Sequence, residues 1–174
     1  QNKFNFQNDS KIIPQMQTNY KTERLMLRTL TAADTAFIFE LVNTAGWIKF
    51  IGDRNIHTNE NAEQYIQKII SNPDVSYRVV TLQDEQTAVG IVTLIKRNYL
   101  QHRDIGFAFL PAYAGQGYAF EASVAVLADL LKSNQHQTIL ATTLKENISS
   151  IQLLHKLGFS FSKEITNEND TPQL

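Results

Sequence analysis

The chain has 174 residues, with 16 basic and 17 acidic side chains and no cysteine, so one domain with a well-packed core is expected. The balanced charge argues against nucleic acid as a partner, and the absence of cysteine excludes disulfides, thiolate metal ligands and a cysteine nucleophile. The sequence contains no run of about 18 apolar residues and no signal-peptide pattern, so we expect a cytoplasmic protein that does not bind membranes.

The beginning of the chain is polar, rich in Asn and Gln, and without sustained periodicity. We therefore predict a loose N-terminal arm over residues 1–19 and a single domain over residues 20–174. The stretch ERLMLRTL then alternates, with Leu25 and Leu27 on one face, which predicts the first strand of the domain.

Two amphipathic helices are predicted after this strand. In TAADTAFIFELVN, Thr31 and Asp34 have the spacing of a capping box and precede apolar residues at helical intervals. A second apolar stripe follows Thr58 or Asn59 as its N-cap. The segment before it, residues 46–58, is too irregular for a helix and is predicted to be a loop.

The rest of the chain alternates strands and helices. SYRVVTL and AVGIVTLI, separated by the polar turn QDEQ, predict an antiparallel hairpin, and DIGFAFL predicts a further strand. A long helix follows, then the strand TILATTL, a short helix that Gly158 closes, and the strand GFSFSKEI. This order predicts an α/β or α+β fold with helices on both faces of the sheet.

The stretch PAYAGQGYAFEA places Gly115 and Gly117 between a predicted strand and a predicted helix. The first turn of a helix has unpaired N–H groups and a partial positive charge, and glycine lets a phosphate approach the backbone closely. Phe120 stands where a dinucleotide-binding fingerprint has its third glycine, and the Gly-Lys-Ser/Thr of a P-loop is absent. From the residues alone, the segment is either an anion-binding turn or a tight turn that binds nothing.

Two longer stretches, DIGFAFLPAYAGQGYAFEA and ENISSIQLLHKLGF, together resemble the acyl-CoA-binding core of the GNAT superfamily of N-acetyltransferases. The stretch TERLMLRTLTAADTAFIFELVN resembles the opening strand and helix of its RimJ/RimL-type branch, which acetylates protein N-termini and assorted amines. The resemblance covers about residues 22–163, in the family's order. It implies the GNAT fold, with a mixed central sheet and helices on both faces, and an acetyltransferase that uses acetyl-CoA as the acyl donor.

The resemblance also implies which residues bind acetyl-CoA. The strand before the glycines would contact the pantetheine arm, the glycine turn would hold the pyrophosphate, and a later asparagine would bind the pantetheine. These residues are Phe109, Leu110, Gly115, Gln116, Gly117, Tyr118, Ala119 and Asn147. From the residues alone, Asn147 is equally an N-cap of the helix that follows it, and Ser150 a residue that bonds within the first turn.

Two positions depart from the family's pattern. The turn of relatives usually opens with Arg or Gln, where this chain has Ala114, so we expect a modest loss of affinity or a substitute from Gln116. Many relatives also carry a tyrosine that protonates the departing thiolate, and this chain has Leu154 at that position. A thiol with a pKa near 8.5 leaves readily close to neutral pH, so catalysis does not depend on that tyrosine. Ser150, Tyr118 or water are the remaining proton donors.

Asp104 and Ser150 are the candidate catalytic residues. Asp104 begins the strand whose far end would hold the thioester, where relatives often carry an acidic residue, and it would accept a proton from the amine directly or through water. The alternative is an exposed strand-end charge paired with His102 or Arg103. Ser150 matches the serine of the branch's N-x-x-S pattern. Glu121 is expected to be a structural charge near the start of its helix.

The irregular segment GWIKFIGDRNIHT is predicted to bind the acceptor. Trp47, Asp53 and Arg54 are its candidate substrate-binding residues, with Asp53 suited to a cationic acceptor and Arg54 to a carboxylate or peptide carbonyls. A salt bridge between these charged neighbours and a buried Trp47 are the alternatives. The four histidines include no helical i, i+4 pair, so no metal site is predicted.

These residues together predict an enzyme that transfers the acetyl group of acetyl-CoA to a primary amine, either on a small molecule or at a protein N-terminus. The alternatives are a non-catalytic, regulatory acyl-CoA-binding module and a protein-binding domain whose glycine turn is purely structural. Relatives add one more strand after the last one predicted here. Without it, residues 159–165 would be an exposed edge for dimer formation, so a monomer or a homodimer is expected.

Overall fold

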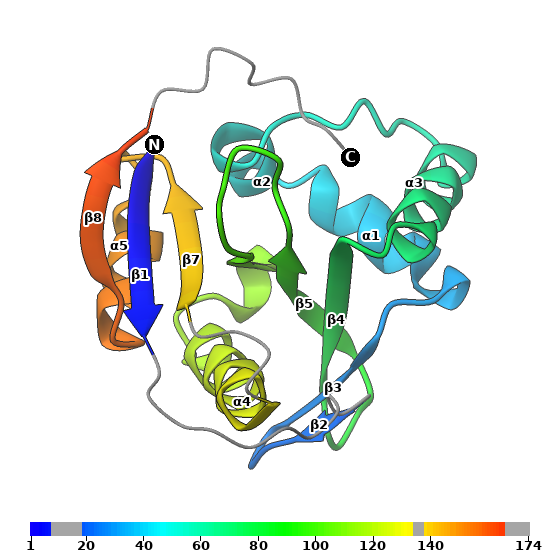
Figure 1. Cartoon of the computed structure of the whole chain (residues 1–174). Helices are drawn as coiled ribbons and strands as arrows, with labels where there is room; N and C mark the ends of the chain where they lie inside the picture. The colour runs from blue at the N-terminus through cyan, green and yellow to red at the C-terminus, as the bar shows by residue number, and fades with distance from the viewer. Residues whose placement is uncertain (8–18, 134–137, 166–174) are drawn as a thin grey trace.

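The computed structural model describes residues 1–7, 19–133 and 138–165 (Figure 1). Within these residues, eight strands form one sheet in the order β2-β3-β4-β5-β6-β7-β1-β8, in which β6 and β7 are parallel and the other neighbours antiparallel. The strands are β1 (Asn2–Gln7), β2 (Tyr20–Lys21), β3 (Leu25–Thr29), β4 (Val75–Leu82), β5 (Ala88–Ile95), β6 (Asp104–Phe109), β7 (Thr138–Thr143) and β8 (Ser160–Glu164). The helices are α1 (Thr35–Val42), α2 (Ala45–Phe50), α3 (Asn59–Ser71), α4 (Tyr118–Ser133) and α5 (Ile148–Lys156).

Helices cover both faces of this mixed sheet, as predicted (Figure 1). Helices α1, α2 and α3 pack on one face, and α4 and α5 pack on the other. Strand β5 is buried on both sides, because Ile91 belongs to the core under α1 to α3 and Val92 to the core under α4 and α5. No helix in the described ranges is long and apolar enough to cross a membrane.

The predicted capping box at the start of the first helix is confirmed. Thr31 and Asp34 bond to each other's backbone groups, and the Asp34 carboxylate also accepts two hydrogen bonds from Arg28, at 2.9 and 2.6 Å. Asp34 is only 4% exposed, so its charge depends on these donors.

This cluster predicts an acid-sensitive contribution to stability. Burial alone would raise the pKa of Asp34, but hydrogen bonds from Arg28 and Thr31 hold it below the ordinary value of 3.8. A lowered pKa in the folded state stabilises the protein at neutral pH, and this contribution is lost as the pH falls. Between about pH 5 and pH 3, urea unfolding should show a steeper loss of stability for the wild type than for Asp34→Asn. Parallel curves would contradict the assignment.

The prediction of a continuous loop over residues 46–58 is wrong in its first part. Residues 45–50 form α2, and the hydroxyl of Thr44 caps it by accepting the amide of Trp47 at 3.3 Å. A helix of six residues is too short to show a helical period, so Thr44 was the only local signal.

The prediction of a loose N-terminal arm is wrong for residues 2–7. These residues form β1, which lies between β7 and β8 and pairs antiparallel with both (Figure 1). Phe4 is 1% exposed, and its ring meets the rings of His155 and Phe161 edge to face. The sequence NKFNFQ gives too short a polar and apolar alternation to predict a strand whose partners lie over 130 residues away. Residues 8–18 of the predicted arm lie outside the described residues.

Strand β8 is the outermost strand on this side of the sheet, and all five of its residues are exposed. Its inner edge pairs with β1, so only the outer edge is open in the described part of the chain. The dimer surface expected at residues 159–165 stays a prediction.

Candidate active site

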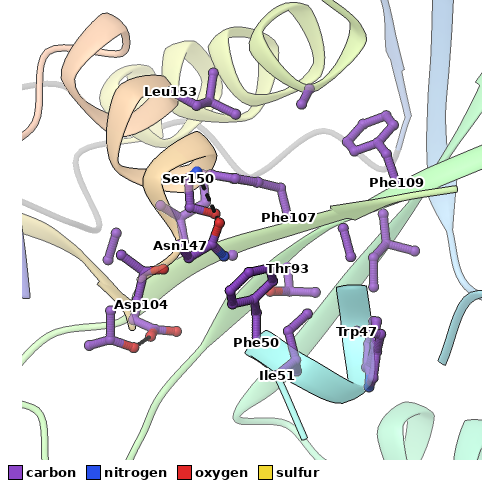
Figure 2. A pocket seen from close by; sticks show the side chains of 18 of the residues that line it. Trp47, Phe50, Ile51, Thr93, Asp104, Phe107, Phe109, Asn147, Ser150 and Leu153 are labelled. Carbon is purple, nitrogen blue, oxygen red and sulfur yellow. Dashed lines mark hydrogen bonds between the residues drawn. The ribbon is translucent and has the colours of Figure 1, made fainter. Parts of the chain in front are cut away.

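A cleft opens where the two parallel strands of the sheet diverge. Strand β6 pairs with β5 along its whole length, whereas it pairs with β7 only at Asp104↔Leu140. Beyond Asp104, one backbone edge of β6 therefore has no strand partner among the described residues. A cleft of about 1860 Å³ lies there (Figure 2), and its walls come from α2, β5, β6, the glycine turn and α5. An extended ligand can form hydrogen bonds with such a free strand edge.

The glycine turn forms one end of the cleft. Gly115 and Gly117 have φ angles of 74° and 81°, a conformation that glycine adopts without strain. In the described structure, no backbone acceptor pairs with the amides of residues 115–120, which lead into α4. The space beside Gly115 is open, because nothing lies within 4 Å of where a Cβ would be. The residues present therefore fit a phosphate group.

Arg24, at the start of β3, supports this turn and was missed by sequence reasoning. Its Nη1 donates to the carbonyl oxygen of Gln116 at 3.0 Å, and its guanidinium lies 4.5 Å from the centre of the Tyr118 ring. Its Nε also donates to Glu121 at 2.7 Å, which confirms that Glu121 has a structural role. Its Nη2 also lies 2.7 Å from the Glu121 carboxylate, so this ion pair holds the guanidinium beside the turn. No local signal could reveal it, because 92 residues separate Arg24 from Gln116.

The start of α5 forms the cleft wall facing β6. Asn147 is the N-cap of α5, and its Oδ1 accepts the amide of Ser150 at 3.2 Å. The capping alternative is therefore confirmed. The cap uses only the Oδ1 atom of Asn147, so its Nδ2 group is left to donate to a ligand. Asn147 and Ser150 both line the cleft (Figure 2). Leu154 on the same helix lines the cleft and, as a leucine, offers no proton donor there.

Asp104 lies at the point where β6 and β7 diverge. It is 2% exposed, which overturns the alternative of an exposed strand-end charge. Its Oδ2 accepts hydrogen bonds from Arg97 Nε at 3.0 Å and Thr142 Oγ1 at 2.8 Å, while Oδ1 is buried without a partner among the described residues. Arg103, one of the partners considered for Asp104, pairs with Asp74 instead, at 3.7 Å.

The pKa of Asp104 is raised above its ordinary value, because burial disfavours the charged carboxylate more than Arg97 and Thr142 favour it. A carboxylate with a raised pKa binds a proton more readily than an exposed aspartate does. Asp104 therefore has the burial and the unpartnered oxygen of a proton-accepting group, and it lines the cleft.

The wall opposite α5 comes from α2 and the residues after it. Figure 2 shows Trp47, Phe50 and Ile51 on this side of the cleft, across from Asn147 and Ser150. Trp47 is only 4% exposed, so the alternative of a buried Trp47 is confirmed. Its indole Nε1 is buried and has no acceptor in the described residues.

Most of the residues predicted for the site line this one cleft: Trp47, Arg54, Asp104, Phe109, Gly115, Gly117, Tyr118, Ala119, Asn147 and Ser150. Three others do not. Leu110 is buried, and its amide donates to the carbonyl of Val89 at 2.9 Å. Gln116 turns its side-chain amide to the carbonyl of Ala112 at 3.1 Å. Asp53 is exposed, and its Oδ1 accepts the amide of Asn55 at 2.7 Å.

Known proteins are similar to this chain in sequence and in fold. The model of a family described as "Acetyltransferase (GNAT) domain" matches residues 24–160. The N-acetyltransferase YnaD of Bacillus subtilis (strain 168), described as uncharacterized, is 29% identical over 137 residues, which are 79% of this chain and 79% of that protein.

Solved structures of acetyltransferases have a similar fold. A GNAT-family acetyltransferase from Bacillus anthracis is 28% identical, with a TM-score of 0.69 over 80% of this chain and 82% of that one. Spermidine N-acetyltransferase from Vibrio cholerae, solved with CoA and spermine, is 22% identical, with a TM-score of 0.72 over 84% of this chain and 87% of that one, and shows the shared fold. The family match spans most of the chain, so this protein belongs to the GNAT acetyltransferases and is an acyl-CoA-dependent acetyltransferase.

Proposed function

We propose that this protein transfers the acetyl group of acetyl-CoA directly to a primary amine, on a small molecule or at a protein N-terminus. One observation carries the proposal. The cleft beside β6 has unpaired amide donors at one end, in the glycine turn, and the buried carboxylate of Asp104 at the other. A donor that is anionic at one end and carries a reactive thioester at the other matches this polarity.

Acetyl-CoA supplies the activated acetyl group, and the chain's residues bind and orient it. The amides of Gly115 to Ala119 would hold the pyrophosphate, with Arg24 fixing the turn through the carbonyl of Gln116. The free edge of β6 up to Phe109 and the Nδ2 of Asn147 would hold the pantetheine. The thioester would then lie toward Asp104, and not at the far end of β6 as expected from the sequence, because that end adjoins the glycine turn.

Asp104 is proposed to accept the proton of the amine, through its unpartnered Oδ1 or a bridging water. An α-amine with a pKa of about 7.7 to 8.0 needs only about 1 kcal/mol to lose a proton at neutral pH, whereas a lysine needs roughly 4 kcal/mol. The site therefore suits an amine of low pKa. Ser150, on the α5 wall, is proposed to give a proton to the departing thiolate in place of the tyrosine that Leu154 replaces.

The Asp104→Asn variant tests this role. We expect kcat to fall about 100-fold or more, as for the loss of a general base, while acetyl-CoA affinity changes little. Because the pKa of Asp104 is raised, wild-type kcat should rise with pH through that pKa, and the variant should lose this limb. Asp74→Asn, which removes a half-exposed carboxylate at the cleft, is the matched control. Equal kcat in Asp104→Asn and Asp74→Asn would contradict the assignment.

The competing function is a regulatory module that binds acyl-CoA without turnover, and the alanine and leucine at positions 114 and 154 motivate it. Incubating the protein with acetyl-CoA and a panel of amines, with thiol release and product mass as readouts, separates the two. Acetylated product supports the enzyme. Binding of acetyl-CoA without product from any amine supports the module. Membership of the RimJ/RimL-type branch is part of the proposal and rests on the resemblance of TERLMLRTLTAADTAFIFELVN.

A further inference from the structure

The acceptor side of the cleft carries a guanidinium without a counter-ion. Arg54 follows α2 and lines the cleft, and its Nε and Nη1 are buried without an acceptor in the described parts of the chain. Gly52 has a φ of 111°, and a Cβ there would lie 3.6 Å from Nη1 of Arg54. Burying an unpaired cation is unfavourable, and it is typical of a site where a ligand supplies the missing partner.

A second unpaired donor belongs to the same segment. The Nε1 of Trp47 has no acceptor in the described residues, and the side chain is 4% exposed. The side chains of Arg54 and Trp47 therefore both lack a hydrogen-bond acceptor among the described residues. A ligand in the cleft that carries an acceptor would satisfy them. A cationic ligand offers no acceptor and would be repelled by Arg54.

Arg54 and Asp104 line the same cleft. Tyr77 and Arg97, the partner of Asp104, line it as well. Tyr77 faces Thr93 of β5 in the sheet, and Thr93 faces Gly106 of β6, close to Asp104 along the same strand. An amine near Asp104 and an acceptor group near Arg54 can thus belong to one small molecule.

The charges around the cleft exclude a polycation as the best acceptor. Among the described residues that line it, Asp74 and Asp104 are the carboxylates, and each is already paired with an arginine. Lysines also line the cleft, for example Lys49 and Lys96. The described lining thus offers a polyamine no unpaired carboxylate, in contrast to what the spermine-bound Vibrio cholerae neighbour would suggest for this fold.

We propose that the acceptor is a primary amine that also carries a carboxylate, and that Arg54, with Trp47 as a second donor, binds this carboxylate. The inference rests on the proposed function. In the transfer, the amine nitrogen forms a C–N bond with the acetyl carbon as the C–S bond breaks, and the electron pair of that bond leaves on the sulfur of CoA. The ammonium first loses one proton to solvent, and Asp104 accepts the second proton when the amide forms.

Steady-state kinetics with matched amines test this inference. The probes are ω-amino acids, whose amine pKa changes little when the carboxylate becomes a primary amide, these amides themselves, and spermidine. For the wild type, we expect the preferred substrate to be an amino acid, with kcat/KM about 10- to 100-fold above that of its amide, as for a hydrogen-bonded charge. Arg54→Gln should remove this preference, mainly through KM, and Arg54→Lys should restore part of it. Lys68→Gln, which removes an exposed charge of α3 outside the cleft, is the control and should change nothing.

Three outcomes would overturn the inference, and they differ in what else they affect. If spermidine or the amides react as well as the amino acids, or if Arg54→Gln keeps the preference, the carboxylate site falls and the acetyltransferase assignment stands. If acetyl-CoA binds and neither this panel nor a peptide with a free N-terminus is acetylated, the proposed function falls together with the inference. If only the peptide N-terminus is acetylated, the carboxylate site falls and the acetyltransferase assignment stands.

Discussion

Replacing Gly117 by glutamate is expected to weaken acetyl-CoA binding by about 100-fold or more, because it adds a negative charge to the turn that would hold the pyrophosphate. Gly117 has a φ of 81° and lines the cleft, and the amides around it have no backbone acceptor in the described structure. Isothermal titration of acetyl-CoA into the wild type and into Gly117→Glu measures the effect.

Two further variants separate charge from backbone strain. Gly117→Asn keeps a residue that tolerates positive φ and adds no charge, so it should lose much less affinity than the glutamate. Ala112→Glu adds the same charge at an exposed position outside the cleft lining and should bind normally. If Gly117→Glu folds and binds acetyl-CoA as the wild type does, the glycine turn serves only the fold.

Phe4→Ala is expected to lower the free energy of unfolding by about 3 to 5 kcal/mol, the range for removing a fully buried phenylalanine. Phe4 stands opposite Ala141 of β7 and Phe161 of β8 and contacts His155 of α5, so its loss leaves a cavity between these strands and α5. Strand β7 also carries Thr142, which donates to Asp104, so this damage extends to the cleft. Urea unfolding followed by circular dichroism measures the change.

Lys3→Ala is the matched control, because Lys3 lies in the same strand and is partly exposed. A surface substitution of this kind should change stability by about 0.5 kcal/mol or less. A Phe4→Ala effect no larger than that of Lys3→Ala would show that β1 contributes little to the folded sheet.

The glycine turn and the start of α5 could be predicted from the sequence because their signals are contiguous. Gly115 and Gly117 stand together between a strand and a helix, and Asn147 stands at a helix start, so each segment shows its place in the fold locally. The two core faces followed from apolar periodicity. Thr31 caps the 3-10 turn that leads into α1, and Thr58 caps α3, both as predicted.

The rest depends on contacts between distant segments, which periodicity does not encode. Arg24 meets the glycine turn across the sheet, and β1 finds partners near the other end of the chain. Asp104 lines the cleft, as expected for a residue of the site. Its burial and its pairing with Arg97, however, follow from how β5 and β6 come together. Arg54 lines the cleft, whereas its neighbour Asp53 is exposed. This difference follows from the turn at Gly52, which has a positive φ.

Residue-resolved amide hydrogen exchange, with and without acetyl-CoA, tests the central claim most directly. The amides of residues 115–120 have no backbone acceptor in the described structure, so they should exchange fast in the free protein and slow strongly when the pyrophosphate binds. Slowing should extend along β6 toward Asp104, where the pantetheine would lie. Saturating acetyl-CoA that leaves the exchange of residues 115–120 unchanged would contradict the account.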